Sequence, residues 1–292
     1  MTYGMTDRFD ALLKHFSLKA KAFRSGPICG VHEADIGKGV GLIHLVFDGD
    51  VSVHHSLNEQ LHITQPSLLV YPRALPHTFI IPPQESALLV CAHLAFGGGE
   101  ANLLAASLPD WFCVPLTDLG GAAGVLALLQ DEAFKDNCGR QAVLDRLFEV
   151  VLIYVLRVMV QQRELQPGLL AGMAHPRLRS VLIALHDDSA RGWTLESMAA
   201  LAGMSRSVFA NEFREVLGCT PAVYLQRWRI GLTQQALLKG QPLKLITHEV
   251  GYSSEAALSR AFKTQLGLTP RQWLNGQGLN GQGLNGQGTS AP

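Results

Sequence analysis

The spacing of apolar and polar residues changes along the chain and divides it into two halves. From about Ser25 to Phe112, short apolar runs such as GLIHLVFDG and HTFIIPP are separated by Gly, Pro, Asp or Asn roughly every ten residues, which is typical of antiparallel strands. Beyond about Gln141, apolar residues recur instead at helical spacing. The pattern predicts an α+β protein with a β-rich first domain and an all-α second domain.

The first C-terminal repeat, from Trp193 to Gly218, predicts a helix-turn-helix. Apolar residues at helical spacing begin it, Gly203 breaks the helix, and Ser205 can cap a second helix. The apolar positions of the two helices are Leu195, Met198, Ala199 and Ala202, then Val208, Phe209 and Phe213. One such pattern is weak evidence, because any bundle of short helices can imitate it.

The second repeat, from Pro242 to Gly267, follows the same design about fifty residues later. Gly251 marks its turn and Ser254 its cap, and each repeat ends in a phenylalanine, a basic residue and a glycine. These residues are Phe213, Arg214 and Gly218 in one repeat and Phe262, Lys263 and Gly267 in the other. Two copies in tandem predict a pair of DNA-binding modules.

A long helix is predicted between the two repeats. Thr220 and Pro221 form a favourable N-cap and first position, and AVYLQRWRIGLTQQALL follows without a breaker as far as Gly240. About 18 helical residues span roughly 27 Å, close to the ~34 Å between successive major-groove faces of duplex DNA. Such a rod would hold two recognition helices about one helical turn of DNA apart.

Four segments carry a resemblance to a known family: TLESMAALAGMS from Thr194, GCTPAVYLQRWR from Gly218, LITHEVGYSS from Leu245 and GLTPRQWL from Gly267. In these segments the sequence resembles the AraC/XylS family of bacterial transcription regulators. The resemblance implies an AraC-type DNA-binding domain over 176–274, with helix-turn-helix modules at 195–216 and 243–265. It also implies a sequence-specific regulator of double-stranded promoter DNA that forms a homodimer and contacts RNA polymerase if it is an activator.

The resemblance further implies which side chains contact DNA. Base contacts are carried over to Ser207, Ala210 and Asn211 in the first recognition helix and to Ala256, Ala257 and Arg260 in the second. Asparagine can pair with adenine and arginine with guanine, whereas alanine can touch only thymine methyl groups, so the second helix is expected to read fewer bases. Candidates for phosphate contacts are Arg206, Arg214, Arg227, Arg229, Lys244, Lys263 and Arg271.

The N-terminal half is similar to cupin-type regulator sensor domains in two segments. GVGLIHLVFDGD, residues 39–50, predicts a strand that ends in a Gly-Asp turn, and PSLLVYPRALPH, residues 66–77, predicts a strand that enters a proline-rich turn. The resemblance implies a cupin-like β-barrel, or jelly roll, with accompanying helices over 25–140. Its expected role is to sense an unknown small molecule, an oxidant or a metal.

Enzymatic cupins bind a metal through two histidines at i and i+2, a glutamate, and a later histidine. This chain has His44 and His77 but Val46 at the second position, and Asp48 and Asp50 stand where the glutamate is expected. Iron-dependent oxygenases need two histidines and a carboxylate on one face. A metal-dependent cupin enzyme fused to a DNA-binding module is therefore the weaker alternative, as is an architectural DNA binder without an effector, and we expect no enzymatic activity.

A polar cluster is still expected in the barrel from His44, His77, Cys91 and His93, since Cys91 and His93 fall on one face of a strand. Three interpretations fit: buried packing, a zinc site of Cys91 with His77 and His93, and a thiol switch that uses Cys29 with Cys91. Zinc is the only cofactor that these residues suggest. His54, His55 and His62 are expected to face solvent.

The net charge of zero conceals an asymmetry between the two halves. Residues 176–292 carry 12 Lys and Arg against 7 Asp and Glu, a balance of +5, and residues 1–175 carry 12 against 17, a balance of −5. A basic half beside an acidic half is typical of a nucleic-acid module fused to another domain. The 5 cysteines have no paired spacing, which favours the reducing bacterial cytoplasm, at the nucleoid, over a disulfide framework.

The flanking segments have simpler patterns. Residues 1–24 are expected to hold an amphipathic helix, and the LNGQG repeats of residues 275–292 predict a disordered tail. Residues 141–175 are assigned to a dimerisation helix and linker. Their apolar run from Val150 to Val160 is too short for a membrane span, which needs roughly 20 residues, so no membrane partner is expected. This helix could instead pack within its own domain.

Overall fold

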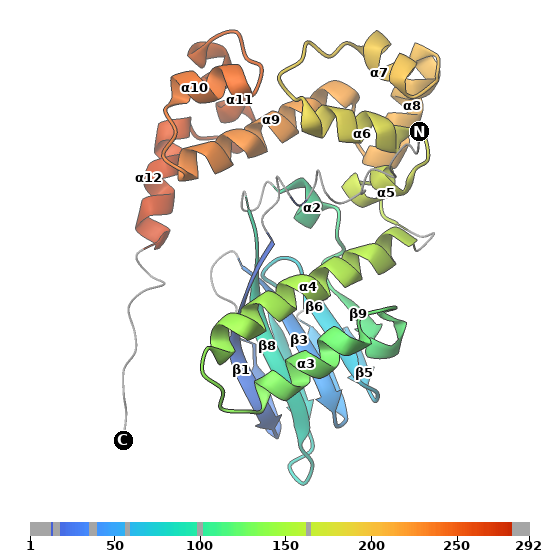
Figure 1. Ribbon diagram of the computed structural model, residues 1–292, viewed down its shortest axis with the longest axis vertical. Helices are drawn as coiled ribbons and strands as arrows, with labels where there is room; N and C mark the ends of the chain where they lie inside the picture. Colours follow the sequence, from blue (N-terminus) through green and yellow to red (C-terminus); the bar gives the residue numbers. More distant parts are fainter. Residues whose placement is uncertain are drawn as a thin grey trace. The chain divides into compact units, whose positions relative to one another are not determined.

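The computed structural model describes Leu13 and residues 18–34, 40–55, 59–97, 102–161 and 165–281. Two compact units divide the chain, Met1–Pro176 and Arg177–Pro292 (Figure 1). The division lies beside residue 176, where the DNA-binding domain is expected to begin. Each unit has its own apolar core, one among strands and the other among helices.

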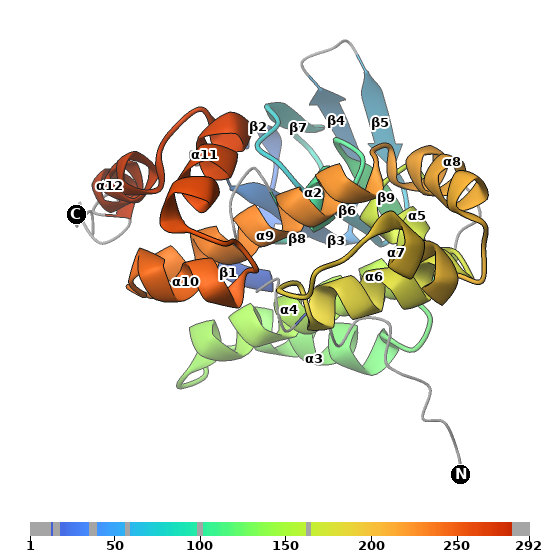
Figure 2. The same ribbon diagram turned by 90° about the horizontal axis from the view of Figure 1, so that it is seen from above.

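Two antiparallel β-sheets form the first unit. The five-stranded sheet has the order β1 (Leu18–Ile28), β8 (Ala87–Phe96), β3 (Gly41–Asp48), β6 (Ser67–Tyr71), β9 (Phe112–Pro115). The four-stranded sheet has the order β2 (Gly30–Glu33), β7 (His77–Ile81), β4 (Val51–His55), β5 (Gln60–Ile63). Figure 2 shows the sheets as stacked layers. The layers confirm the β-rich first domain predicted from the apolar pattern.

Helices cover the outer face of the five-stranded sheet. In Figure 1, α3 (Ala123–Ala133) and α4 (Arg140–Gln161) lie across its strands, and the ring of Phe47 on β3 lies 6.3 Å from that of Phe134 at the end of α3. Covered on both faces, β6 is buried throughout, whereas β4 alternates buried and half-buried residues. Shorter segments are α2 (Leu103–Ala106), the 3-10 turn η2 (Leu116–Asp118) and α5 (Leu169–Ala174).

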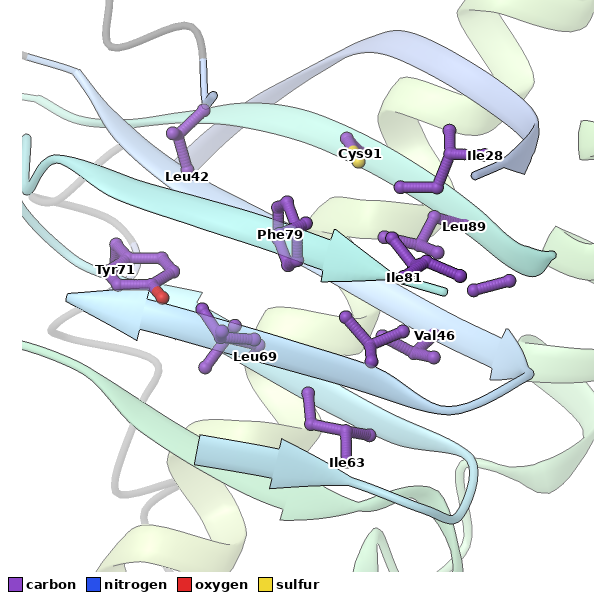
Figure 3. Close-up of a cluster of buried hydrophobic side chains, with 13 residues drawn as sticks. Ile28, Leu42, Val46, Ile63, Leu69, Tyr71, Phe79, Ile81, Leu89 and Cys91 are labelled. Atoms are coloured by element: carbon purple, nitrogen blue, oxygen red, sulfur yellow. The ribbon is translucent and has the colours of Figure 1, made fainter. Parts of the chain in front are cut away.

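The core between the sheets draws on both layers, as Figure 3 shows. Leu42, Val46, Leu69 and Leu89 point inward from the five-stranded sheet, and the other sheet contributes Val51, Val53, Ile63, Phe79 and Ile81. All are at most 4% exposed. Burying a side chain of this size stabilises the fold by about 1.5–3 kcal/mol, so this cluster contributes strongly to the unit's stability.

The predicted continuous helix after Gln141 is α4. One side of it is buried in its own unit, where the carboxylate of Asp145 accepts a hydrogen bond from the backbone N–H of Ala22 on β1 at 2.8 Å. The buried residues are Leu144, Phe148, Val151, Leu152, Val155, Leu156, Met159 and Val160. None of the described helices is both long and apolar enough to cross a membrane.

The helix expected over residues 1–24 is wrong for its last part. Residues 18–24 belong to β1, because Ala20 and Ala22 alternate with exposed Lys19 and Lys21 and pair with β8. An alternating pattern fits a strand with one buried face, which overrides the helical spacing of the preceding residues. Leu13 is helical, and the rest of this prediction lies outside the described residues.

The second unit is entirely helical. Its helices are α6 (Leu178–Asp187), α7 (Leu195–Leu201), α8 (Arg206–Leu217), α9 (Pro221–Leu238), α10 (Leu243–Glu249), α11 (Glu255–Leu266) and α12 (Pro270–Gly281). The all-α prediction is confirmed, with α7–α8 and α10–α11 at the positions of the two sequence repeats. The predicted linker is the single helix α9, which at 18 residues is about 27 Å long.

Local capping explains where the recognition helices begin and end. The hydroxyls of Ser205 and Ser254 accept hydrogen bonds from the backbone N–H of the third residue of α8 and α11, at 3.4 and 3.2 Å. Both helices end at a glycine in the left-handed conformation, Gly218 with φ 72° and Gly267 with φ 74°. Only glycine adopts this conformation without steric cost, so each module ends at a defined residue.

The disordered tail expected over residues 275–292 is wrong for its first part, since α12 continues to Gly281. The side chain of Gln272 accepts a hydrogen bond from the N–H of Thr269 at 3.0 Å, and Trp273 and Leu274 pack against the core. Once a helix is nucleated and packed, adding residues is inexpensive. The remainder of the tail lies outside the described residues.

Candidate functional site

The first recognition helix, α8, separates an apolar face from a polar one. Phe209 and Phe213 are fully buried, with ring centroids 5.5 Å apart. The residues predicted to contact DNA lie on the other side: Arg206, Ser207, Asn211 and Arg214 are exposed and Ala210 is half-buried. Val208, an apolar position of the predicted helix, is 49% exposed. The polar face of α8 is therefore largely exposed to solvent.

The second recognition helix, α11, has the same division but fewer polar groups. Leu258 and Phe262 are fully buried. Among the predicted contact residues, Ala256, Arg260 and Lys263 are exposed and Ala257 is half-buried. With alanine at two of three base-facing positions, Arg260 is the one side chain of that set able to donate hydrogen bonds to a base.

An ion pair joins α8 to the start of α7. Nη1 of Arg206 lies 2.6 Å from Oε1 of Glu196, and hydrogen bonding to Arg206 lowers the pKa of this carboxyl. Both side chains are well exposed, so the pair adds little stability. The pair engages Nη1 of Arg206, and the guanidinium has further N–H donors that can contact a phosphate.

Arg229 was expected to contact phosphate, and the structure assigns it a different role. From α9 its Nε and Nη2 donate to the carbonyl oxygen of Ser189 at 2.9 and 2.6 Å, and Nη2 also donates to the carbonyl of Arg191 at 3.2 Å. The guanidinium of Arg229 lies 5.6 Å from the ring centroid of Tyr252, and burial lowers the pKa of Arg229. Arg229 therefore ties the segment before α7 to α9.

The turn of the second module meets the same segment. Gly251 has φ +79°, and a Cβ placed on it would lie 2.7 Å from both Cα and O of Ala190. Only glycine allows this approach. Because Arg229 of α9 binds the residues on either side of Ala190, this short segment before α7 contacts both the linker helix and the turn of the second module. Packing through this segment therefore restrains one module against the other, in addition to the linker helix.

The buried side of α9 supports that arrangement. Nε2 of His186 on α6 lies 2.7 Å from the hydroxyl of Tyr224, and the imidazole stacks on Trp228 with ring centroids 3.8 Å apart. Both aromatic residues are 2% exposed. The hydrogen bond satisfies the Tyr224 hydroxyl in an otherwise apolar core, and burial raises the pKa of this phenol.

In the first unit the structure brings His44 and His77 together. Their Nε2 atoms lie 3.0 Å apart, and Nδ1 of His77 lies 2.8 Å from the carbonyl oxygen of Leu75. A carbonyl only accepts, so Nδ1 of His77 carries the proton and its Nε2 accepts from His44. Burial lowers the pKa of His77 to about 4 and that of His44 well below its usual value, so both are neutral at pH 7.

The structure adds three residues to this cluster that sequence reasoning missed. Nε2 of His55 lies 2.8 Å from the hydroxyl of Tyr71, Tyr71 stacks on His77 with centroids 3.8 Å apart, and Trp111 stacks on His55 at 4.4 Å. His55 was expected to face solvent but is 6% exposed. Val51 and Val53 precede it in the same alternation, and that signal could have placed it inside.

Two imidazole nitrogens in this cluster are left without partners. Nδ1 of His44 and Nδ1 of His55 are buried and make no hydrogen bond to the described residues. A buried polar atom without a partner costs about 1–3 kcal/mol. The cluster, defined as His44, His55, Tyr71, His77 and Trp111, therefore holds unused hydrogen-bonding capacity.

The predicted zinc site is not formed. No three His, Cys, Asp or Glu side chains of the described residues are grouped so as to hold a metal ion. Cys91 lies opposite His44 in the β3–β8 register but within the apolar core, where burial raises the pKa of its thiol to about 12. His93 stacks on Phe23 instead, with centroids 4.3 Å apart.

The two cysteines of the predicted thiol switch differ in access. Cys29 is the single residue between β1 and β2 and is exposed, whereas Cys91 is buried. The thiolate is the reactive form, and a thiol with a pKa of about 12 is almost entirely protonated at neutral pH. Direct oxidation of Cys91 is thus disfavoured in this structure.

Comparison with known proteins identifies both units. A family model described as cupin matches residues 7–161, and one described as helix-turn-helix domain matches residues 198–276. An AraC-like transcription regulator of Streptomyces antibioticus is 37% identical over 64% of this chain and 63% of its own length. This chain thus spans less than two thirds of that relative.

Two further relatives are matched over more of their length. An HTH-type transcriptional regulator of Haemophilus influenzae is 31% identical, over 82% of this chain and 87% of its own. The RCS-specific transcriptional activator RclR of Escherichia coli is 26% identical, over 79% and 82%. Given a cupin domain followed by a helix-turn-helix domain and these relatives, the chain belongs to the AraC family of transcription regulators with an N-terminal cupin-type sensor domain.

Proposed function

We propose that the helical unit binds double-stranded promoter DNA by inserting α8 and α11 into successive major grooves. The observation that carries this proposal is the pair of exposed polar helix faces joined by α9, a single helix about 27 Å long. The junction at Arg229 and Gly251 supports a fixed spacing, because it restrains one module against the other. A fixed spacing selects two half-sites about one helical turn of DNA apart.

Base recognition is assigned mainly to α8. Asn211 can donate to and accept from adenine, Ser207 can bond to several bases, and Ala210 can touch a thymine methyl group. On α11, Arg260 can pair with guanine while Ala256 and Ala257 add apolar contact. Arg214 and Lys263, exposed at matching positions of the two helices, would bind phosphates and set the register.

We propose that the protein acts as a homodimer through the second face of α4. Val143 and Val150 are 38% and 37% exposed there, and half-buried Leu147 and Tyr154 continue the stripe. Spacings of four, three and four residues are those of a helix–helix seam. A dimer would place a second helical unit on the promoter and, in an activator, next to RNA polymerase. Val150→Glu should give monomers in light scattering, whereas Leu128→Glu on exposed α3 should not.

The signal is proposed to enter through the cupin-type unit, at or beside the cluster of His44, His55, Tyr71, His77 and Trp111. A small effector that donates a hydrogen bond to Nδ1 of His44, or forms one with Nδ1 of His55, would remove the desolvation cost of that atom. Binding energy gained there would favour one packing of the sheets that support α4. An oxidant is a second candidate signal, with the exposed thiol of Cys29 as its point of entry.

Regulation is favoured over catalysis by the cupin unit. Val46, buried in the core, stands where enzymatic cupins have a second histidine, and the two remaining histidines bond to each other. A purely architectural role would leave the buried polar cluster unexplained. We place the protein in the bacterial cytoplasm, at the nucleoid, as the site of promoter DNA.

The affinity of the full-length protein for DNA as a function of salt tests this function. Several Lys and Arg that displace counterions should give a log–log slope of about −5 to −8 between roughly 50 and 200 mM salt. Lys263→Ala should make the slope less negative by about 1, and Lys135→Ala, in the other unit, should not change it. An affinity that ignores salt would refute DNA binding through these faces.

A further inference from the structure

The helical unit contains a cavity of about 670 Å³ between its two modules. It draws on the segment before α7, on α7, α8, the first half of α9, and the second module. The residues that line it are Trp193, Leu195, Met198, Ala210, Asn211, Arg214, Thr220, Pro221, Ala222, Leu225, Gln226, Arg229, Tyr252 and Ala261. This volume lies within the ~300–1,000 Å³ of ordinary small-molecule sites.

One part of the lining is aromatic and apolar. Trp193 is positioned by a hydrogen bond from its Nε1 to the carbonyl of Asp188 at 2.8 Å, and the guanidinium of Arg191 lies 4.6 Å from its ring centroid. Tyr252 is half-buried. The rings of Trp193 and Tyr252, together with the side chains of Met198 and Leu225, form the apolar part of the lining. This surface suits a flat hydrophobic group.

The charged part of the lining is entirely positive. Arg214 and Arg229 contribute guanidinium groups, and none of the lining residues is acidic. Arg214 is exposed, without an ion pair among the described residues. Arg229 uses Nε and Nη2 for the carbonyls of Ser189 and Arg191, which leaves its Nη1 donors without a protein acceptor in the described part of the chain.

We propose that this cavity binds a small aromatic carboxylate. The planar guanidinium of Arg214 can bind a carboxylate through two parallel N–H···O bonds, and the Nη1 group of Arg229 can add a third donor. The amides of Asn211 and Gln226 are further polar partners. The aromatic ring of the ligand stacks on Trp193 or Tyr252. A simple inorganic anion would use the arginines but leave the apolar walls bare.

The position of the cavity implies a regulatory effect. Ala210, Asn211 and Arg214 line it and also form the face of α8 assigned to DNA, so a ligand seated there would compete with the duplex. This effect rests on the proposed DNA-binding function, whereas ligand binding itself does not. The cavity would act directly on DNA binding, without a signal from the cupin-type unit.

Titration calorimetry on the full-length protein without DNA tests the site. The probes are biphenyl-4-carboxylate, its neutral analogue biphenyl-4-carboxamide, and inorganic phosphate. We expect the carboxylate to bind about tenfold or more tightly than the amide, since charge-assisted hydrogen bonds are about twice as strong as neutral ones. Arg214→Gln should weaken carboxylate binding about tenfold, and the charge-matched control Lys239→Gln, outside the cavity, should leave it unchanged.

A second variant separates this cavity from the barrel. Trp193→Leu should weaken the carboxylate about tenfold, whereas Trp111→Leu, in the cupin-type unit, should not. The proposal would be overturned if the amide or inorganic phosphate bound as tightly as the carboxylate. It would also be overturned if both Arg214→Gln and Trp193→Leu bound the carboxylate as tightly as the wild type.

Competition is measured by fluorescence anisotropy of labelled promoter DNA. The carboxylate should release DNA from the wild-type protein at the concentrations that fill the cavity. Calorimetric binding without release would refute the overlap with the DNA face. If the protein without ligand does not bind DNA but the carboxylate still binds in calorimetry, the proposed function is refuted and the ligand site is not.

Discussion

The histidines of the cupin-type unit and the arginines of the helical unit occupy opposite environments. His44, His55 and His77 are at most 6% exposed and lie between two sheets, whereas Arg214 and Arg260 are exposed on recognition helices. Burial favours the neutral form of the imidazoles, whereas arginine carries its charge in either environment. The first environment suits a small, uncharged hydrogen-bonding partner, and the second suits a large polyanion.

Lowering the pH should destabilise the cupin-type unit, because its buried histidines must then take up protons. The folded-state pKa of His77 is about 4 against an ordinary 6.5, so the unfolded chain binds more protons between these values and stability falls as the pH falls through this window. The loss from His77 should be about 3 kcal/mol, and His44 acts in the same direction.

Urea denaturation at a series of pH values from 4 to 7.5 measures this loss. His77→Gln should flatten the dependence, and His62→Asn, on the exposed side of β5, should leave it as in the wild type. A wild-type stability that is constant across the window would mean that the buried histidine pair does not form.

Arg229 is the exception within the helical unit, and its removal should cost more than that of any exposed arginine. Arg229→Leu leaves the carbonyls of Ser189 and Arg191 without their donor, a loss of about 1.5–3 kcal/mol. Arg227→Leu, at the exposed neighbouring position of α9, should change stability by no more than about 0.5 kcal/mol. Thermal unfolding of the two variants compares them, and equal melting temperatures would contradict a structural role for Arg229.

Exposed arginines should affect DNA binding and not stability. Arg260→Ala should cost about 1–3 kcal/mol at a specific site and relax preference at one base pair. Arg214→Ala should weaken all sequences about equally, as expected for a phosphate contact. Affinities for the specific site and its single-base variants test this, and the reverse pattern would show that the two helix faces are misassigned.

The same contrast explains what could be predicted from the sequence. Helix boundaries in the second unit depend on local signals such as Ser205, Ser254 and the Thr220-Pro221 pair, each of which acts within three or four residues. These positions were predicted correctly, as was the duplicated design. Residues 275–281 were expected in the disordered tail because their glycine-rich repeat has no apolar periodicity, but they continue α12.

The interior of the barrel depends instead on strand register. His44 meets His77 across 33 residues, and His55 meets Tyr71 across 16. The pairing of His44 with His77 was expected. The spacing of the residues could not show that Cys91 and His93 lie outside this cluster. His55 could be placed inside the barrel only once the buried face of β4 was known. Arg229 bonds to Ser189, 40 residues away, so no local pattern distinguishes it from an exposed phosphate contact.

The central claim is that α8 and α11 bind successive major grooves and that α8 reads more of the sequence. Selection of binding sites from random duplexes by the full-length protein tests it most directly. Two conserved segments about one helical turn apart are expected, roughly 10 base pairs, with the segment under α8 more strongly specified. Asn211→Ala should erase preference in that segment, and Arg260→Ala in the other. A single conserved segment, or one that Asn211→Ala leaves intact, would contradict the claim.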